Sequence, residues 1–274
     1  MKKILVPIDF SADSINALEL AISFANTIDA NVRMIHVKKS KNFEVPFYFK
    51  DFDLVIGKSL DDFMNILVGK YKGELKNLLD YKIREGNIYK EITNQAKYDD
   101  SYLIVMGTHG VSGFEELWIG SNAFRVVSNS PCPIITIRNG FLSKQLQNIV
   151  MPIDISNDTR QKVPFVTELA KYFNATIHIV GVSEINDLEL TSRIAKYCSQ
   201  VEEYLKEKGV ACTKTVLTGS NITDLTIGYA NQVKAEMIAI MTEQITNTAF
   251  WLGPFAQQMV NHSPVPVLSI HSQN

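Results

Sequence analysis

Short apolar runs alternate along this chain with segments in which apolar residues recur every three or four positions. In the first half, residues 4–8, 32–37, 103–106 and 134–137 predict strands, and the continuous apolar run at 4–8 predicts one covered on both faces. The helical spacing predicts helices at 15–25, 59–79, 89–97 and 121–128. Strands that alternate with helices predict a three-layer α/β fold with a parallel sheet.

The same order of elements occurs twice. Residues 4–11 (ILVPIDFS) return 145 positions later as IVMPIDIS, and residues 130–137 (SPCPIITI) return 133 positions later as SPVPVLSI. The second copy is shorter mainly because the first has an extra stretch after Val37. The repeat predicts two homologous domains, residues 1–140 and 146–274, and their short connector predicts that the halves pack together.

Composition excludes several classes of protein. The balance of 27 Lys and Arg against 29 Asp and Glu, a net charge of −2, argues against a surface that neutralises nucleic-acid phosphates. No apolar stretch has the length of a membrane-spanning helix, and the N-terminal apolar run is too short for a signal peptide. The three cysteines have no metal-site spacing and fit a reducing compartment. We therefore expect a cytoplasmic protein that binds neither nucleic acid nor membrane.

A glycine-rich segment, residues 107–122, follows the strand at 103–106 and is called the glycine loop below. Because glycine has no Cβ, Gly107, Gly110 and Gly120 allow tight bends and close approach to a ligand. The first-turn N–H groups of the next helix have no partners within the helix and form an anion site with its dipole. Ser121 adds a hydroxyl and Asn122 an amide. This segment predicts phosphate binding at the carboxyl end of a strand, where ligands bind in such sheets.

The glycine loop resembles that of the universal stress protein family. Nucleotide-binding members of that family carry Gly, two residues, Gly, nine residues, and then Gly followed by Ser or Thr, which is the spacing seen here. The opening VPIDFS at 6–11 and the PCP at 131–133 are similar to the family's first turn and last strand. The resemblance covers both halves. It implies tandem Rossmann-like (adenine nucleotide alpha hydrolase-like) α/β domains, each a five-stranded parallel sheet flanked by helices.

The resemblance also implies a ligand, ATP or another adenine nucleotide, held with Mg or Mn. In the family's ATP-binding members, the loop after the first strand binds the adenosine, with its aspartate carboxylate near the ribose. The backbone at the end of the second strand contacts the edge of the adenine. The glycine loop holds the phosphates. Pairing of the two domains within the chain is implied, and a homodimer is left open. The residues implied to bind the nucleotide are Pro7, Ile8, Asp9, Val37, Met106, Gly107, His109, Gly110, Gly120, Ser121 and Asn122.

The second copy departs from this pattern. When Trp118-Ile119-Gly120 is aligned with Trp251-Leu252-Gly253, two residues are missing, Thr242 stands for Gly107, and Pro254 stands for Ser121. Proline has no N–H to donate, and Glu243 adds a negative charge. We expect one nucleotide per chain, in the first domain.

Structural interpretations stand beside the functional ones. The three glycines could be turn residues, and Asp9 and Asp154 could cap helices or close a loop. Cys132 lies between two prolines, where a buried apolar role is favoured over redox chemistry. The aromatic-rich segment 43–52, present only in the first copy, favours a partner interface or a hydrophobic plug between the domains over a lid on the nucleotide.

The leading functional hypothesis is an ATP-binding regulatory or stress-response protein with at most slow hydrolysis and no catalytic residue, because no base or arginine finger is identifiable beside the glycine loop. A non-nucleotide interaction module of the same family is the alternative. A nucleotidyl-transfer enzyme is disfavoured, because the first strand–helix turn contains no histidine.

Overall fold

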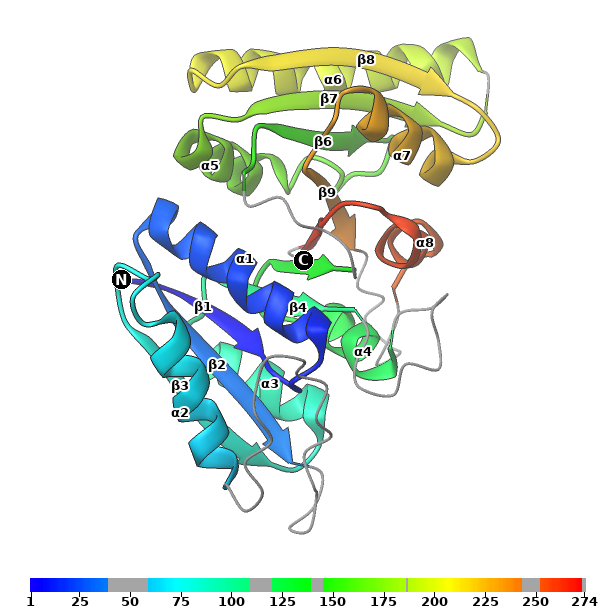
Figure 1. Cartoon of the computed structure of the whole chain (residues 1–274). Helices are drawn as coiled ribbons and strands as arrows, with labels where there is room; N and C mark the ends of the chain where they lie inside the picture. The colour runs from blue at the N-terminus through cyan, green and yellow to red at the C-terminus, as the bar shows by residue number, and fades with distance from the viewer. Residues whose placement is uncertain (39–58, 109–119, 139–144, 186, 243–251, 273–274) are drawn as a thin grey trace. The chain divides into compact units, whose positions relative to one another are not determined.

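The computed structural model describes residues 1–38, 59–108, 120–138, 145–185, 187–242 and 252–272. The chain separates into two compact units, Met1–Leu142 and Ser143–Asn274. Each unit has a five-stranded parallel sheet with helices on its faces (Figure 1). The predicted α/β class and Rossmann-like sheets are confirmed.

In the first unit the strand order is β3-β2-β1-β4-β5. Helices α1 and α2 lie side by side, joined by a hydrogen bond from the Tyr71 hydroxyl to Glu19 Oε1 (2.9 Å), and α3 packs against α4. The apolar residues at the centres of β1, β2 and β4 are buried, as their sequence pattern predicts. The elements are β1 (Lys2–Pro7), α1 (Ala12–Ile28), β2 (Ala30–Lys38), α2 (Leu60–Tyr71), β3 (Leu79–Glu85), α3 (Ile88–Tyr98), β4 (Leu103–Gly107), α4 (Ser121–Asn129) and β5 (Ile134–Ile137).

The predicted helix at 59–79 is wrong in its second half. Helix α2 ends at Tyr71, and a loop leads into the edge strand β3. The Asn26 side chain fixes this loop, because it donates to the Glu74 carbonyl (2.7 Å) and accepts from the Lys76 N–H (2.8 Å). Leu75 continues the apolar spacing and its side chain is buried, but the residue lies in the loop and not in a helix.

The second unit repeats the order as β8-β7-β6-β9-β10. The elements of the second unit are β6 (Asn148–Ile153), α5 (Val163–Phe173), β7 (Thr176–Ser183), α6 (Leu188–Glu207), β8 (Cys212–Thr218), α7 (Ile222–Gln232), β9 (Met237–Thr242), α8 (Pro254–His262) and β10 (Val267–His271).

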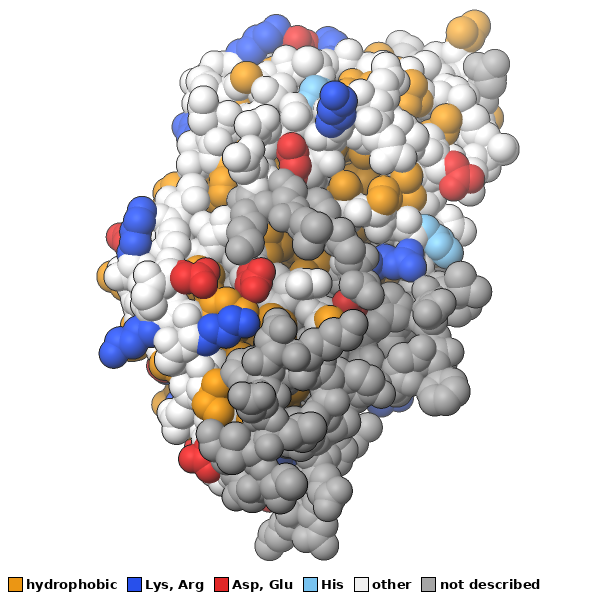
Figure 2. Space-filling model, viewed as in Figure 1, with side chains coloured by type: hydrophobic (Ala, Val, Ile, Leu, Met, Phe, Trp, Pro, Cys, Tyr) orange, Lys and Arg blue, Asp and Glu red, His pale blue; other side chains and the backbone are white. Residues whose placement is uncertain are grey.

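Charged side chains of both signs are interspersed over the described surface that faces the viewer (Figure 2). No helix among the described residues is long and apolar enough to cross a bilayer.

The first helix is shorter in the second unit. The C-cap residues of α1 and α5 are equivalent: Asp29 and Asn174 both have left-handed backbone (φ 56° and 51°). The starts of the two helices differ, because Ala12 corresponds to Asn157 but α5 begins only at Val163. Consecutive turns replace the missing helical residues.

Lys162 lies in these turns, at the position that Ala17 has in α1. Its side chain is 2% exposed and donates from Nζ to the Thr159 carbonyl. Burial lowers the pKa of the Lys162 ammonium to about 8, and the nearby Asp154 and Asp158 oppose this shift only in part. The second unit therefore carries a buried amine at a position where the first unit has Ala17.

Candidate functional site

A cavity of about 190 Å³ lies at the carboxyl ends of β1, β2 and β4 in the first unit. Helices α3 and α4 complete its wall, through Ile88 and Ile92 and through the first turn of α4. This is the edge of the sheet at which ligands bind in doubly wound folds. Nine of the predicted binding residues line the cavity: Pro7, Ile8, Asp9, Val37, Met106, Gly107, Gly120, Ser121 and Asn122. The other two, His109 and Gly110, lie outside the described residues, as does the segment 43–52.

The turn after β1 has the same hydrogen bonds in both units. Asp9 Oδ1 accepts from the Ser11 N–H (3.0 Å) and hydroxyl (2.5 Å), and Asp154 Oδ1 accepts from Ser156 in the same way (2.8 and 2.5 Å). The structural role considered for both aspartates is therefore present. In Asp9, which lines the cavity, both of these hydrogen bonds go to Oδ1.

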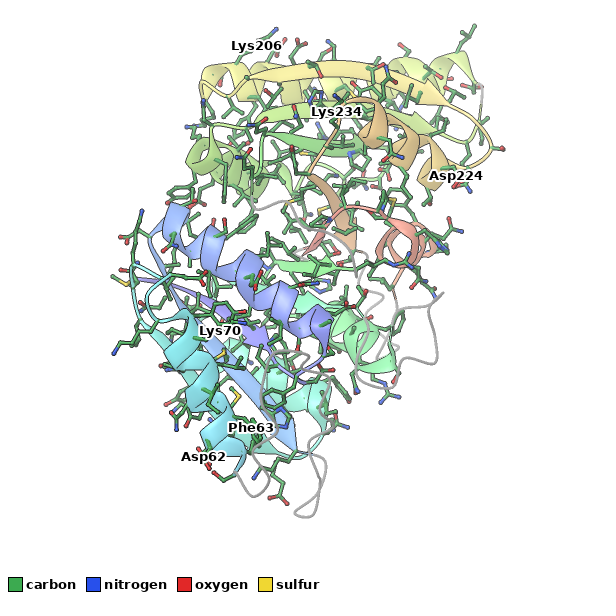
Figure 3. All side chains as sticks on the ribbon, viewed as in Figure 1. Asp62, Phe63, Lys70, Lys206, Asp224 and Lys234 are labelled. Carbon is green, nitrogen blue, oxygen red and sulfur yellow. The ribbon has the colours of Figure 1, made fainter. Side chains whose placement is uncertain are left out.

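Phe10 holds this turn in an unusual backbone conformation. Its φ is +65°, in the left-handed region that bulky residues rarely adopt. Its ring is 1% exposed and lies 5.2 Å from the His36 ring and 6.3 Å from the Phe63 ring, centroid to centroid; Phe63 can be found on α2 in Figure 3. The equivalent Ile155 is 41% exposed and does not have positive φ. Aromatic packing thus anchors the residue beside Asp9 in the first unit alone.

Gly107 is required by the packing of α1 on β4. A Cβ at this position would lie 2.6 Å from Asp13 Cβ and 3.0 Å from the Asp13 carbonyl carbon. The packing of α1 on β4 therefore requires a glycine at position 107, independently of the close approach to a ligand that the sequence predicts.

The strand register corrects the alignment of the two glycine loops. Leu103 pairs with Ile4 and Met237 pairs with the equivalent Ile149, so Met241 and not Thr242 stands for Gly107. Thr242 stands for Thr108, since both hydroxyls donate to the carbonyl of the neighbouring strand, at 3.3 and 3.2 Å. The second loop is therefore one residue shorter and not two. A methionine at the position of Gly107 is compatible with α5 because that helix begins later.

The N-terminus of α4 presents unpaired backbone donors to the cavity. Gly120 is the N-cap and supplies no side-chain hydrogen bond, while its own N–H donates to the Thr108 carbonyl (2.9 Å). The first helical bond is from Phe124 N–H to the Gly120 carbonyl. The N–H groups of Ser121 and the next two residues have no helical acceptor, which makes an anion site. In α8 the equivalent of Ser121 is Pro254, which lacks this donor.

Sequence reasoning missed seven of the lining residues, which are Ser14, Ile35, His36, Ile88, Ile92, Thr108 and Ala123. His36 Nδ1 donates to the Ile8 carbonyl (2.7 Å), and burial lowers the pKa of the imidazole. The ring is therefore neutral at pH 7 and ties β2 to the turn after β1. Ile88 and Ile92 share one face of α3, and that spacing alone is equally typical of a core helix.

The side-chain oxygens at the cavity supply some of the ligands that a metal ion needs, but not a complete set. Among the described residues, no group of three or more His, Cys, Asp or Glu side chains could hold an ion. Asp9 contributes one carboxylate, and Ser121 and Asn122 contribute neutral oxygens. Mg²⁺ is commonly held by one or two carboxylates together with substrate phosphates. These residues therefore fit a cation that arrives with a phosphate ligand.

Cys132 is half-buried, so the predicted buried role is met only in part. Burial raises the pKa of its thiol to about 12, so the thiol is protonated at neutral pH and a weak nucleophile.

The first unit has a doubly wound parallel sheet with a cavity at its carboxyl edge, which is the edge where ligands bind in α/β folds of this kind. The model of the universal stress protein family matches residues 1–138 and again residues 145–271. The chain belongs to the universal stress protein family, as a tandem form, and the resemblance seen in its motifs is confirmed.

Individual relatives match half of the chain. Universal stress protein MJ0531 of Methanocaldococcus jannaschii is 32% identical over 139 residues, which are 50% of this chain and 82% of that protein. Universal stress protein MJ0577 of the same organism is 28% identical over 153 residues, 50% of this chain and 94% of that protein.

Solved structures of tandem length share the fold over almost the whole chain. A universal stress protein from Archaeoglobus fulgidus has a TM-score of 0.74 at 17% identity and covers 98% of both chains. A putative universal stress protein from Pseudomonas aeruginosa has a TM-score of 0.75 at 15% identity, over 99% of this chain and 94% of that one.

Proposed function

We propose that the first unit of this stress-response family member binds an adenine nucleotide, with ATP as the leading ligand and a divalent cation held through its phosphates. The second unit binds none. The observation that carries the proposal is the cavity at the ends of β1, β2 and β4, into which the uncapped N-terminus of α4 opens.

The parts of the cavity match the parts of such a ligand. Ile35, Val37, Ile88 and Ile92 give it an apolar side suited to a base. Asp9 Oδ2 is an acceptor suited to a ribose hydroxyl. The donors of α4 and the glycine at 107 suit phosphates, because backbone N–H groups and the helix dipole favour anions.

The role we propose is regulatory, with at most slow hydrolysis. Asp9 and His36 are the titratable side chains among the described residues that line the cavity. One oxygen of Asp9 is engaged by Ser11 and His36 Nδ1 is engaged by Ile8, so neither is arranged as a base beside the phosphate end.

Ser121→Pro tests the proposal, because it copies the second unit. Proline is well tolerated at the first helical position, so the fold is retained while one N–H and the hydroxyl are lost. We expect calorimetric titration with Mg-ATP to show one site per chain and a loss of affinity of about tenfold or more in this variant.

Ser121→Ala is the matched control, because it removes the hydroxyl and keeps the N–H. Its affinity should lie between those of the other two proteins. Two equivalent ATP sites per chain, or no saturable binding at millimolar Mg-ATP, would contradict the proposal.

A further inference from the structure

The two units differ in where their first two strands stop pairing. In the first unit, the pairing of β1 with β2 ends at Pro7 and Ile35. In the second unit, the equivalent pairing of β6 with β7 continues for one more residue, to Ile153 and Gly181. The register is the same in both units, so at the carboxyl edge they differ by this one pair.

The His36 side chain takes the place of the missing pair. Ile8 and His36 correspond, 145 positions earlier, to the last pair of the second unit. In a parallel ladder that pair is closed by the Val182 N–H, which donates to the Ile153 carbonyl. In the first unit, the Ile8 carbonyl accepts instead from His36 Nδ1 (2.7 Å). The imidazole thus occupies the acceptor that the Val37 N–H would otherwise use.

The backbone of Val37 is therefore open on the side of β1. The Ile35 carbonyl accepts the Ile8 N–H (2.8 Å), whereas the Lys38 carbonyl accepts the N–H of Gly86, which follows β3 (2.9 Å). Since successive residues of a strand bond alternately to its two neighbours, Val37 faces β1 as Ile35 does. Among the described residues, neither its N–H nor its carbonyl has a hydrogen bond there. Because β1 has ended and Val37 lines the cavity, both groups face it.

Packing holds the imidazole in the first unit and leaves no room for one in the second. His36 is 4% exposed, and its ring centroid lies 5.2 Å from that of Phe10. A Cβ on Gly181 would lie 2.7 Å from Cγ2 of Ile194 and 3.1 Å from Sγ of Cys198, both on α6. The second unit therefore cannot replace its ladder hydrogen bond by one from a side chain at this position.

We infer that His36 is a positioning residue of the nucleotide site, because it frees the Val37 N–H and carbonyl to bind the edge of the base. The inference rests on the proposed function and deepens it, since it makes His36 a determinant of base selectivity. Adenine presents an amino donor beside a ring-nitrogen acceptor, which matches a free carbonyl and a free N–H. Hypoxanthine has a carbonyl and a ring N–H at these positions, so each would meet a group of its own kind.

The first test is amide hydrogen exchange by NMR in the unmodified full-length chain. Val37 is compared with Val182, its equivalent; both are buried (9% and 3% exposed). Each is read against the residue two positions earlier, Ile35 or Val180, which is paired in both units. Without nucleotide, we expect Val37 to exchange about tenfold or more faster relative to its reference than Val182 does, and Mg-ATP should protect it. Equal relative protection without nucleotide would overturn the inference.

The second test is calorimetric titration of Mg-ATP and Mg-ITP, which differ only at the edge of the base, into full-length variants. His36→Leu removes the donor, so the Val37 N–H is expected to close onto the Ile8 carbonyl. ATP affinity should fall about tenfold or more, and the preference for ATP over ITP should shrink with it. His36→Asn keeps an N–H near the place of Nδ1 and should restore most of both.

The outcomes separate the inference from the proposed function. Melting curves establish that the variants fold, and the exchange test decides the matter without them. If the unmodified chain binds ATP and ITP equally, or His36→Leu weakens both equally, as a merely structural role would, the inference is overturned and the proposed function stands. If the unmodified chain binds no adenylate, both fail.

Discussion

Gly107→Ala tests the close packing between α1 and β4. The added Cβ would lie 2.6 Å from Asp13 Cβ, 3.0 Å from the Asp13 carbonyl carbon and 3.1 Å from its oxygen. Two of these three atoms are backbone, so no rotamer change relieves the contact. The first turn of α1 must move away from the strand.

Overpacking of this kind typically costs about 1–3 kcal/mol of folding free energy. For a unit of this size that corresponds to a fall in Tm of about 3–9 °C. The second unit shows the relaxed alternative, since Met241 there coincides with a first helix that starts at Val163, six residues later than the equivalent of Ala12. We therefore expect the variant to loosen the start of α1 and leave its end intact.

Thermal denaturation followed by circular dichroism measures the first effect, and hydrogen exchange by mass spectrometry of peptides from α1 measures the second. Gly69→Ala is the matched control, because a Cβ there meets nothing within 4 Å. It should be neutral or stabilise α2 by up to about 1 kcal/mol. A Gly107→Ala protein that melts within about 1 °C of the unmodified chain, with unchanged exchange at residues 12–17, would refute the packing argument.

Three further predictions concern buried titratable groups. Lys162→Met should stabilise the second unit by about 1–3 kcal/mol at pH 7, because a buried cation is replaced by an apolar chain; a lower Tm would show that the ammonium stabilises the fold. Because the folded pKa of Lys162 is about 8 and its unfolded value about 10.5, the unfolded state binds more protons between these values. Stability should therefore rise from pH 8 to 10, by up to about 1.4 kcal/mol per pH unit, and urea denaturation of Lys162→Met should lack this rise. Burial lowers the pKa of His36, so its contribution to stability is lost as pH falls below about 6.5, and His36→Gln should flatten that decline in the same urea series.

Much of the site was predictable because its motifs are local. The glycine spacing, the serine after Gly120 and the Asp–Ser turn after β1 are short segments whose backbone geometry their own residues favour. The repeat then showed, by comparison within one chain, that Pro254 removes a donor that Ser121 keeps.

The parts that were not predictable depend on segments distant in sequence. Nothing near residue 241 reveals that Met241, and not Thr242, stands opposite Gly107; the pairing of β9 with β6 sets that register. Likewise, the end of α2 at Tyr71 depends on Asn26, a residue of another helix.

Periodicity, turn residues and the internal repeat are carried by neighbouring amino acids, and they suffice for the fold class, the tandem organisation and the place of the glycine loop. The need for glycine at 107 comes from Asp13, and the role of His36 in holding the turn comes from Ile8. These contacts exist only once the sheet is assembled, because close approach and strand register are set by packing between elements that the chain brings together from far apart.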